Sequence, residues 1–388
     1  MGMKPVVTKN VWKMLGFGVA FEVAALAFST HVGGGFALGT QEMQYFVRFG
    51  KSTFYLPLFS MLLLSLTFYF AWEYQMIKGI SSYKEFFEEF YGRSLGRGFM
   101  VLYDIVFSIM VILATGAALA GMANVLRVFH INISLYWGYL FAAIVVYIIA
   151  SFGLKGVLAN ASFMSLGIII IIILLAIFSL PKALPSLSNL PSTPLFGPSF
   201  FQSPFWFALL YTGFQSSIIG SYINGAVVLK TDKQVKTAAI LSFLMNGIML
   251  TLMCLAIAGS YEKALKDPTP TLVVLSTMHP VFSYLYGIML FFALITTAVS
   301  LVYASAKRWM PYGANSKGRW GDENFRFKVW IVIWVILSYA ISNSGIVAIV
   351  KKGYGFFGYI AIAIIVLPIL ILGPSKIAKA RKEAEVKN

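Results

Sequence analysis

The chain has 388 residues, of which 59% are hydrophobic and 11% are charged, and its mean hydropathy is +0.82. This balance excludes a soluble domain of this size. The net charge of +16 does not indicate a nucleic-acid partner, because charges are absent from stretches of about 20 residues, each long enough to cross a bilayer core. The sequence therefore predicts an all-α polytopic membrane protein whose main partner is the lipid bilayer.

Hydropathy predicts ten membrane spans, at about 14–47, 53–77, 98–126, 134–153, 156–180, 203–229, 236–259, 281–306, 328–349 and 353–372. With the N-terminus inside, the cytoplasmic segments hold 22 of the 30 Lys and Arg residues, and the outer loops hold the other 8. This is the positive-inside bias. It predicts a multi-pass protein of the plasma membrane with both termini in the cytoplasm.

The chain divides at residues 181–204, where six prolines predict an extended outer loop. Five spans precede this loop, over about residues 14–180, and five follow it, over about 203–372, before a basic tail at 373–388. An odd number of spans inverts the second half relative to the first, so we expect one transmembrane domain built from two inverted repeats. Aromatic residues at helical spacing in 78–97 predict a short amphipathic helix at the inner surface.

The first span is interrupted by three consecutive glycines, Gly33, Gly34 and Gly35. Each weakens a helix by about 1 kcal/mol relative to alanine, and lipid supplies no partners for the backbone groups that a break releases. The first span of the second half is also irregular, since small and polar residues cluster at 211–221. Interrupted spans at corresponding positions of two inverted halves indicate the binding site of a transporter. Tight helix packing through small residues is the alternative explanation.

The residues Val32-Gly-Gly-Gly-Phe-Ala-Leu-Gly39 resemble the glycine-rich first span of the YkvI-like bacterial membrane proteins. These proteins are relatives of the amino acid–polyamine–organocation superfamily, whose architecture is the LeuT fold. The resemblance covers nearly the whole chain in span number and order, and its other motifs are the stretch 211–221 and Leu294–Ser300 in the eighth span. It implies a LeuT-like fold of ten transmembrane helices, arranged as two inverted five-helix repeats with broken first and sixth helices.

The LeuT fold also implies a sodium site between the first break and the eighth span, built from backbone carbonyls and two hydroxyls. At the family's spacing, the ligands are Ser29, Val32, Ala293, Thr296 and Thr297. A helix places residues i, i+3 and i+4 on one face, as this set requires in the eighth span. Two alternatives stay open: a slip of one residue exchanges Ser29 for Thr30, or the two threonines only bond their own helix.

The resemblance places the substrate beside this site, where unwound backbone and helix N-termini favour a carboxylate. The residues expected to contact the substrate are His31, Gly33, Gly34, Gly35, Tyr211, Thr212, Gly213, Phe214 and Gln215. Tyr211 or Phe214 could also gate the pocket, although packing explains each aromatic ring equally well. His31 is unusual, because the family is expected to carry a small apolar residue there. It could carry a proton, contact the substrate carboxylate, or act only as a hydrogen-bonded structural group.

Ionisable residues inside spans are energetically expensive and are therefore candidates for gating or proton transfer. They are Glu22, Glu42, Asp104 and Lys155. Glu42 could form an outer gate with Arg48, and Asp104 could pair with Arg97 or with a residue of an inner gate. Lys155 begins the fifth span, where a side chain that snorkels to the membrane surface is the simpler expectation.

These features predict a secondary active transporter, with sodium-coupled symport of an amino acid or a similar small zwitterion as the main hypothesis. Proton coupling through His31, Glu22 or Lys155 is the first alternative, and a LeuT-fold sensor or channel is the second. Neither break offers the Asp, Asn and Met cluster that a divalent-metal carrier would use. No sequence motif indicates an enzyme or an ATP-driven pump, and we expect no cofactor besides the coupling ion. The single cysteine, Cys254, excludes an intrachain disulfide.

Overall fold

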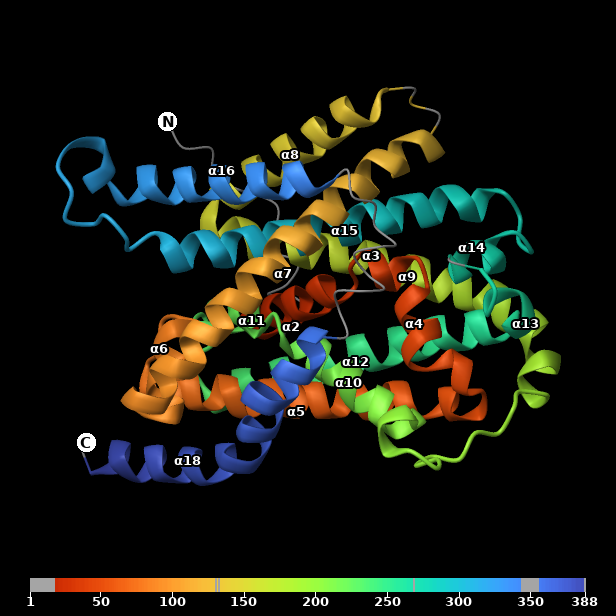
Figure 1. Ribbon diagram of the computed structural model, residues 1–388, viewed down its shortest axis with the longest axis horizontal. Coiled ribbons are helices and arrows are strands. Elements are labelled where there is room, and N and C mark those ends of the chain that lie inside the picture. The colour runs from red at the N-terminus through yellow and green to blue at the C-terminus, as the bar shows by residue number, and fades with distance from the viewer. Residues whose placement is uncertain (1–17, 130, 132, 268, 343–355, 387–388) are drawn as a thin grey trace.

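The computed structural model describes residues 18–129, 131, 133–267, 269–342 and 356–386. In this part of the chain, seven helices are long and apolar enough to cross a membrane. They are α5 (Leu56–Lys78), α7 (Arg93–Val128), α9 (Gly153–Ser188), α12 (Asp232–Ala258), α15 (Val281–Trp309), α16 (Glu323–Ile341) and the segment Phe356–Glu385, which contains η6 (Ile362–Val366) and α18 (Leu367–Glu385). Helix α8 (Leu135–Ser151) is a shorter apolar helix. Figure 1 shows their arrangement in the bundle.

Two further segments are interrupted. The first consists of α2 (Gly18–His31), α3 (Gly34–Ala37) and α4 (Thr40–Tyr45), and the second consists of α10 (Pro204–Ser216) and α11 (Ile219–Ala226). With α8 and the seven long helices, they correspond to the ten predicted spans and confirm that the first and sixth are broken. The predicted start of the first span at residue 14, and the predicted boundary between the last two spans at 349–353, lie outside the described residues.

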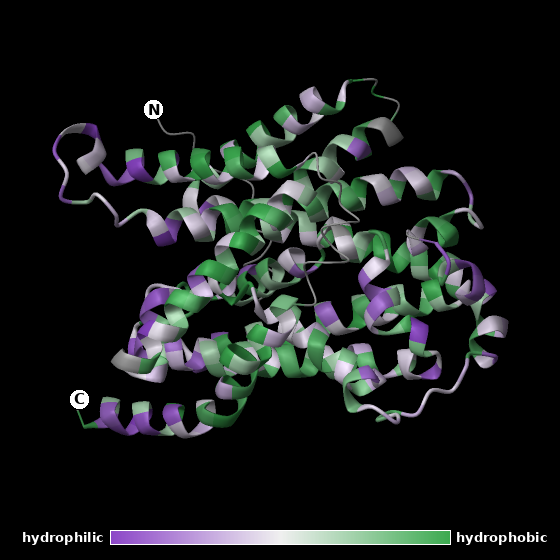
Figure 2. Ribbon diagram, in the orientation of Figure 1, coloured by the Kyte–Doolittle hydropathy of each residue, from purple (hydrophilic) through white to green (hydrophobic). Residues whose placement is uncertain are grey.

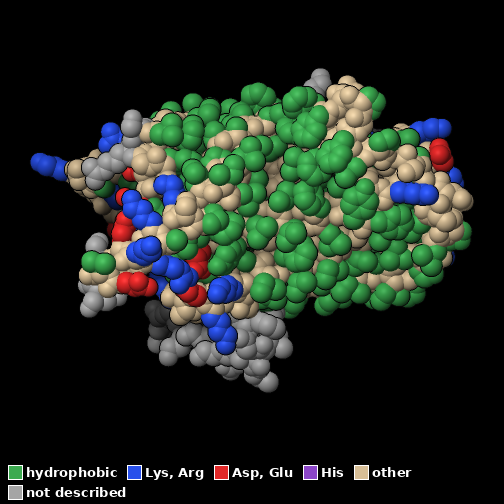
Figure 3. All heavy atoms as spheres, turned by 90° about the horizontal axis from the view of Figure 1, so that it is seen from below, with side chains coloured by type: hydrophobic (Ala, Val, Ile, Leu, Met, Phe, Trp, Pro, Cys, Tyr) green, Lys and Arg blue, Asp and Glu red, His purple; other side chains and the backbone are tan. Residues whose placement is uncertain are grey.

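The molecule has two polar ends separated by an apolar middle. One end carries α6 (Tyr83–Tyr91), η4 (Gly318–Gly321) and the C-terminal part of α18, and we call it the α6 end (Figure 1). The opposite end carries η1 (Val47–Phe49), η2 (Lys51–Phe54), η3 (Phe200–Gln202), α13 (Tyr261–Ala264) and α14 (Pro270–Leu275), and we call it the α14 end. Hydrophobic residues dominate between the ends along the ribbon (Figure 2) and on the face seen in Figure 3. This distribution is that of a multi-pass membrane protein.

Helix α6 confirms the amphipathic helix predicted within 78–97. The hydroxyl of Ser82 accepts a hydrogen bond from the backbone N–H of Glu85 at 3.3 Å, which caps the start of the helix. Its apolar face is buried, and the ring of Phe87 stacks on Tyr103 of α7 with centroids 4.8 Å apart. The apolar face of the helix therefore packs against the bundle, and its polar face remains exposed.

The proline-rich connection is more helical than the sequence predicts. Helix α9 continues to Ser188 and contains Pro181 and Pro185, so the irregular loop begins only at Asn189. The extension is held by packing, because Ala183 is buried and a Cβ added at Gly259 of the neighbouring segment would lie 2.2 Å from its side chain. Tertiary contacts thus outweigh the local helix-breaking tendency of these prolines.

Residues 373–385 of the predicted basic tail form the C-terminal part of α18. The guanidinium of Arg381 bonds the carboxylates of Glu73 and Asp232, the latter at 2.6 Å. Lys78 and Glu383 form a second ion pair at 2.5 Å. Because Glu73 is fully buried, this contact fixes part of the tail to α5 and α12 at the α6 end.

Candidate functional site

The break in the first segment lies at the glycine run, where the regular hydrogen bonds of α2 end. The N–H of Gly33 bonds the carbonyl oxygen of His31 at 2.8 Å, and α3 starts at the next residue. Gly39 then adopts φ 75°, and a Cβ added there would lie 2.6 Å from the hydroxyl of Thr271. Glycine is required at this position, because both the backbone angle and the close approach exclude a side chain. The break lies inside the bundle, since Val32 beside it is fully buried.

The broken end of α2 meets α15 through oxygen atoms. The hydroxyls of Thr296 and Thr297 lie 3.1 and 3.3 Å from the carbonyl oxygen of Ser29. The same hydroxyls lie 3.0 and 2.8 Å from the carbonyl oxygen of Ala293, one turn earlier in α15. Four of the five residues predicted as sodium ligands therefore converge on one spot. In the described part of the chain, the carbonyl oxygen of Val32, the fifth predicted ligand, does not contact either threonine hydroxyl.

The structure also contains the contacts expected from the two alternatives, which are the shift from Ser29 to Thr30 and the bonding of both threonines to their own helix. The carbonyl oxygen of Thr30 lies 3.4 Å from the hydroxyl of Thr297, so the register shifted by one residue also brings an oxygen to the spot. The two threonine hydroxyls do bond their own helix, as Ser and Thr in membrane helices often do. A hydroxyl that donates to a carbonyl retains lone pairs for a cation, and the carbonyls at the end of α2 carry the negative end of its dipole. The oxygen cluster suits a hard monovalent cation.

At the second break, the residues that the sequence predicts as substrate contacts have different surroundings in the structure. The N–H of Ser217 bonds the carbonyl oxygens of Gly213 and Phe214 at 3.0 and 3.1 Å, where α10 gives way to α11. The hydroxyl of Thr212 donates to the carbonyl oxygen of Ser60 on α5 at 3.1 Å. A Cβ added at Gly213 would lie 2.4 Å from the carbonyl oxygen of residue 358. Thr212 and Gly213 therefore make helix-packing contacts.

A small cavity of about 30 Å³ lies between the two breaks. Five residues predicted to contact a substrate line it: His31, Gly33, Gly35, Phe214 and Gln215. Helix α7 contributes small side chains, among them Ala114 and Ala118, which the sequence does not single out. A cavity of this size holds about two water molecules, so it is too small for a solute in this state. No residue that lines it is acidic, lysine or arginine.

His31 connects three segments through hydrogen bonds from both ring nitrogens. Its Nδ1 lies 2.6 Å from the amide oxygen of Asn246 on α12, and its Nε2 lies 2.7 Å from the hydroxyl of Tyr211 on α10. The amide nitrogen of Asn246 is already used, because it donates to the carbonyl oxygen of Ser242 at 2.7 Å. The neutral ring therefore donates from Nδ1 and accepts from Tyr211 at Nε2. The carboxamide oxygen of Gln41 lies 3.4 Å from the same hydroxyl, as a second acceptor that competes with His31 for its one proton.

Replacement of His31 by phenylalanine tests whether this network holds the break together. The change keeps a ring but leaves Asn246 and Tyr211 without their shared partner, and each buried unsatisfied group costs about 1–3 kcal/mol. We expect a clearly lower midpoint of thermal unfolding in detergent for His31→Phe, and a smaller change for His279→Ala, which removes an exposed histidine that bonds the N–H of Val281 at the start of α15. Equal midpoints for the two variants would refute a structural role of the network.

The cavity is separated from the α6 end by a buried ion pair. Asp104 on α7 accepts hydrogen bonds from Nε of Arg308 on α15 at 3.0 and 3.1 Å, and from the hydroxyl of Tyr83 on α6 at 2.9 Å. Arg97, one of the partners considered from the sequence, is exposed and lies seven residues earlier in the same helix, about 10 Å along its axis. Beyond the pair, a cavity of about 320 Å³ opens at the α6 end and is lined by Tyr83 and Arg308.

The remaining ionisable candidates lie apart from the small cavity. Lys155 is exposed in the first turn of α9, whereas Ser165 of the same helix contacts α2, with its hydroxyl 3.0 Å from the carbonyl oxygen of Ala25. Ten residues of helix span about 15 Å, so Lys155 lies far from the oxygen cluster. Glu22 is half-buried on α2, and Glu42 is fully buried on α4. Neither forms an ion pair with a described residue.

Asn246, Gln41 and Arg308 are the site residues that sequence reasoning missed. Asn246 and Gln41 are uncharged, so the search for ionisable groups inside spans passes over them. Arg308 lies two residues beyond the predicted end of the eighth span, where the sequence indicates only a cytoplasmic cation.

Broken first and sixth helices on either side of a cavity, together with an oxygen contact between the first and eighth, define the LeuT fold. Solved transporters share it. A Na+-coupled sialic acid symporter in a substrate-bound outward-open state has a TM-score of 0.67 and 13% sequence identity over 92% of this chain and 89% of that one. MhsT in complex with L-phenylalanine has a TM-score of 0.64 and 15% identity over 95% and 98% of the two chains. The manganese transporter of Eremococcus coleocola has a TM-score of 0.59 and 15% identity over 94% and 80%.

At these identities, the likeness shows the fold. No protein-family model and no curated protein matches the chain. The YkvI-like family therefore stays a resemblance in sequence motifs. The LeuT-like fold predicted from the sequence is confirmed.

Proposed function

We propose that the chain is a sodium-coupled secondary transporter that carries a small zwitterionic solute, such as an amino acid, by alternating access. The observation that carries the proposal is the convergence of the Thr296 and Thr297 hydroxyls with the carbonyls of Ser29 and Ala293. The solved neighbours of the same fold include symporters that use sodium, which favours the same role for this cluster. Two inverted repeats, about 14–180 and 203–372, would supply the two halves that rock around it.

The lining of the small cavity supports an overall neutral but polar substrate. Hydroxyl, imidazole and carboxamide groups of Thr30, His31, Gln41 and Gln215 face it together with the backbone of the first break. A solute with net charge would be buried there without a charged partner, which costs several kcal/mol. A zwitterion whose ammonium and carboxylate meet backbone and side-chain dipoles avoids this cost. A manganese cargo fits poorly, because no group of three or more His, Cys, Asp or Glu side chains occurs in the described part of the chain.

The charge distribution supports an orientation with the α6 end in the cytoplasm. The loops that the sequence assigns to the inside carry 22 of the 30 Lys and Arg residues. On the face seen in Figure 3, most of the visible Lys and Arg side chains lie at the α6 end. The ion pair between Asp104 and Arg308 would then close the cytoplasmic side in this state. Opening of the cavity would require this pair to separate, or α4 and α14 to move at the other end.

Thermal stability of the purified protein tests the proposal directly. A ligand that binds the folded state raises apparent stability by mass action, by about 2.7 kcal/mol at a concentration of 100 times its Kd. We expect sodium chloride to raise the unfolding midpoint relative to choline chloride, and one class of amino acids to raise it further only when sodium is present. Identical midpoints in sodium and choline, with or without the amino-acid panel, would contradict sodium coupling.

A further inference from the structure

Glu42 is a buried acidic side chain that the proposed function leaves without a role. It is fully buried on α4, and neither of its carboxyl oxygens bonds another described residue. The other two buried acids of the described chain, Glu73 and Asp104, are both paired with arginines. Glu42 is therefore the exception among buried acids in this part of the protein.

The groups around Glu42 carry no positive charge. Its carboxyl interacts electrostatically with Tyr211 of α10, Cys254 of α12 and Tyr286 of α15. Helices α3 and α14, which also pack against α4, contain no titratable residue. Arg48 of η1 follows α4, but its guanidinium lies 4.6 and 4.2 Å from the ring centroids of two phenylalanines, Phe49 and Phe207. The outer gate between Glu42 and Arg48 considered from the sequence is thus not formed in this state.

A desolvated carboxylate without a cation or hydrogen-bond donor costs several kcal/mol. A bound proton removes the charge and leaves a neutral acid among tyrosine hydroxyls and a thiol, which are themselves uncharged. We propose that Glu42 is a proton-binding site that is loaded while the transporter is closed and that exchanges its proton when the α14 end opens. The inference deepens the proposed function and rests on it for the alternating opening of the two ends.

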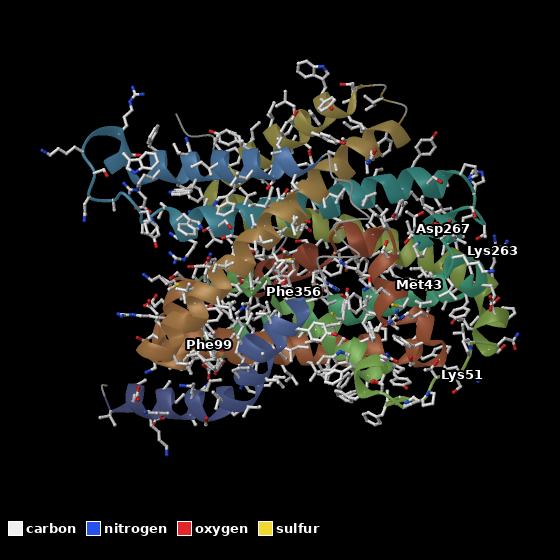
Figure 4. The ribbon with its side chains drawn as sticks, viewed as in Figure 1. Met43, Lys51, Phe99, Lys263, Asp267 and Phe356 are labelled. Atoms are coloured by element: carbon white, nitrogen blue, oxygen red, sulfur yellow. The ribbon has the colours of Figure 1, made fainter. Side chains whose placement is uncertain are left out.

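The geometry of α4 gives the proton a short route to solvent. A cavity of about 390 Å³ at the α14 end is lined by Thr40, Met43 and Gln44 of α4 and by Asp267. Met43 and Asp267 lie at that end of the molecule in Figure 4. At about 100° per residue, positions 40, 43 and 44 share one face of the helix, and position 42 lies on the opposite face. One short helix therefore separates Glu42 from this cavity, and movement of α4 would expose it.

Glu42→Gln tests proton binding, because the amide keeps the shape of the acid and cannot ionise. We expect the infrared spectrum of the purified protein in choline chloride at neutral pH to contain the C=O stretching band of an un-ionised carboxylic acid. The band should be lost in Glu42→Gln and retained in Glu89→Gln, whose side chain is exposed on α6. Transfer to D2O should shift the band as the proton exchanges. An unshifted band, or a difference spectrum that shows only ionised carboxylate, would overturn the proposal.

A second measurement separates this inference from the proposed function. Thr296→Val with Thr297→Val should lose the stabilisation by sodium and keep the infrared band of the acid. Glu42→Gln should lose the band and keep at least part of the stabilisation by sodium. Wild-type protein that is stabilised by sodium, but whose difference spectrum against Glu42→Gln contains only the band of an ionised carboxylate, would refute the proton site and leave the sodium site intact.

Discussion

Replacement of both Thr296 and Thr297 by valine is expected to abolish the response to sodium while the protein remains folded. The two hydroxyls are the only side-chain oxygens among the predicted ligands that face the end of α2, and valine keeps their branched shape. A polar group bonded to a charge contributes about 1.5–3 kcal/mol. Loss of two such groups weakens the affinity for sodium by roughly a hundredfold or more. The midpoint of thermal unfolding, measured over a range of sodium concentrations at constant ionic strength, gives this affinity.

The matched control is the double variant Thr67→Val with Thr251→Val. These hydroxyls also donate to the carbonyl four residues earlier in their own helices, at 2.8 and 2.7 Å, but they lie on α5 and α12. The control therefore removes the same kind of helix bond without touching the oxygen cluster. An unchanged sodium affinity in the α15 variant, or an equal loss in the control, would show that the cluster is a packing contact and not a cation site.

The sequence was sufficient for those features that follow from local chemistry. Apolar length indicates the long helices, and the glycine run at 33–35 indicates the break, because glycine leaves the backbone free to depart from the helix. The spacing of Ala293, Thr296 and Thr297 on one helix turn is also local, and the structure does place them together. The extension of α9 through Pro181 could not be predicted in this way, because it depends on packing between segments far apart in the chain.

The partners of the buried polar groups depend on tertiary structure in the same way. His31 and Asn246 are 215 residues apart, and Asp104 and Arg308 are 204 apart. A single sequence shows that His31 and Asp104 need partners, but not which of many distant polar residues meets each one. The same limit applies to Thr212 and Gly213. The sequence groups them with the cavity, but Thr212 packs against α5 and Gly213 packs against the segment Phe356–Glu385.

Removal of the Asp104 carboxylate is expected to have the largest effect on stability. In Asp104→Ala, Arg308 keeps its charge in a site where it is 8% exposed, and a buried charge that loses its partner costs about 3–5 kcal/mol. The hydroxyl of Tyr83 also loses its acceptor. We expect a strongly lowered unfolding midpoint and a bundle that opens more readily at the α6 end. The double change Asp104→Leu with Arg308→Met leaves no charge behind and should recover most of the loss.

The opening of the α6 end can be measured by the reaction rate of a cysteine placed in the small cavity. Ala114 lines it from α7, and Cys254→Ala provides a background without the native thiol. Ala114→Cys should react slowly with a membrane-impermeant maleimide added from the α6 end, faster when Asp104→Ala is added, and slowly again with the Asp104→Leu and Arg308→Met pair. Equal reaction rates in all three would mean that the ion pair holds helices together without closing a pathway. A rate that rises with the single variant and falls with the apolar pair would assign the closure of this end to the Asp104–Arg308 contact.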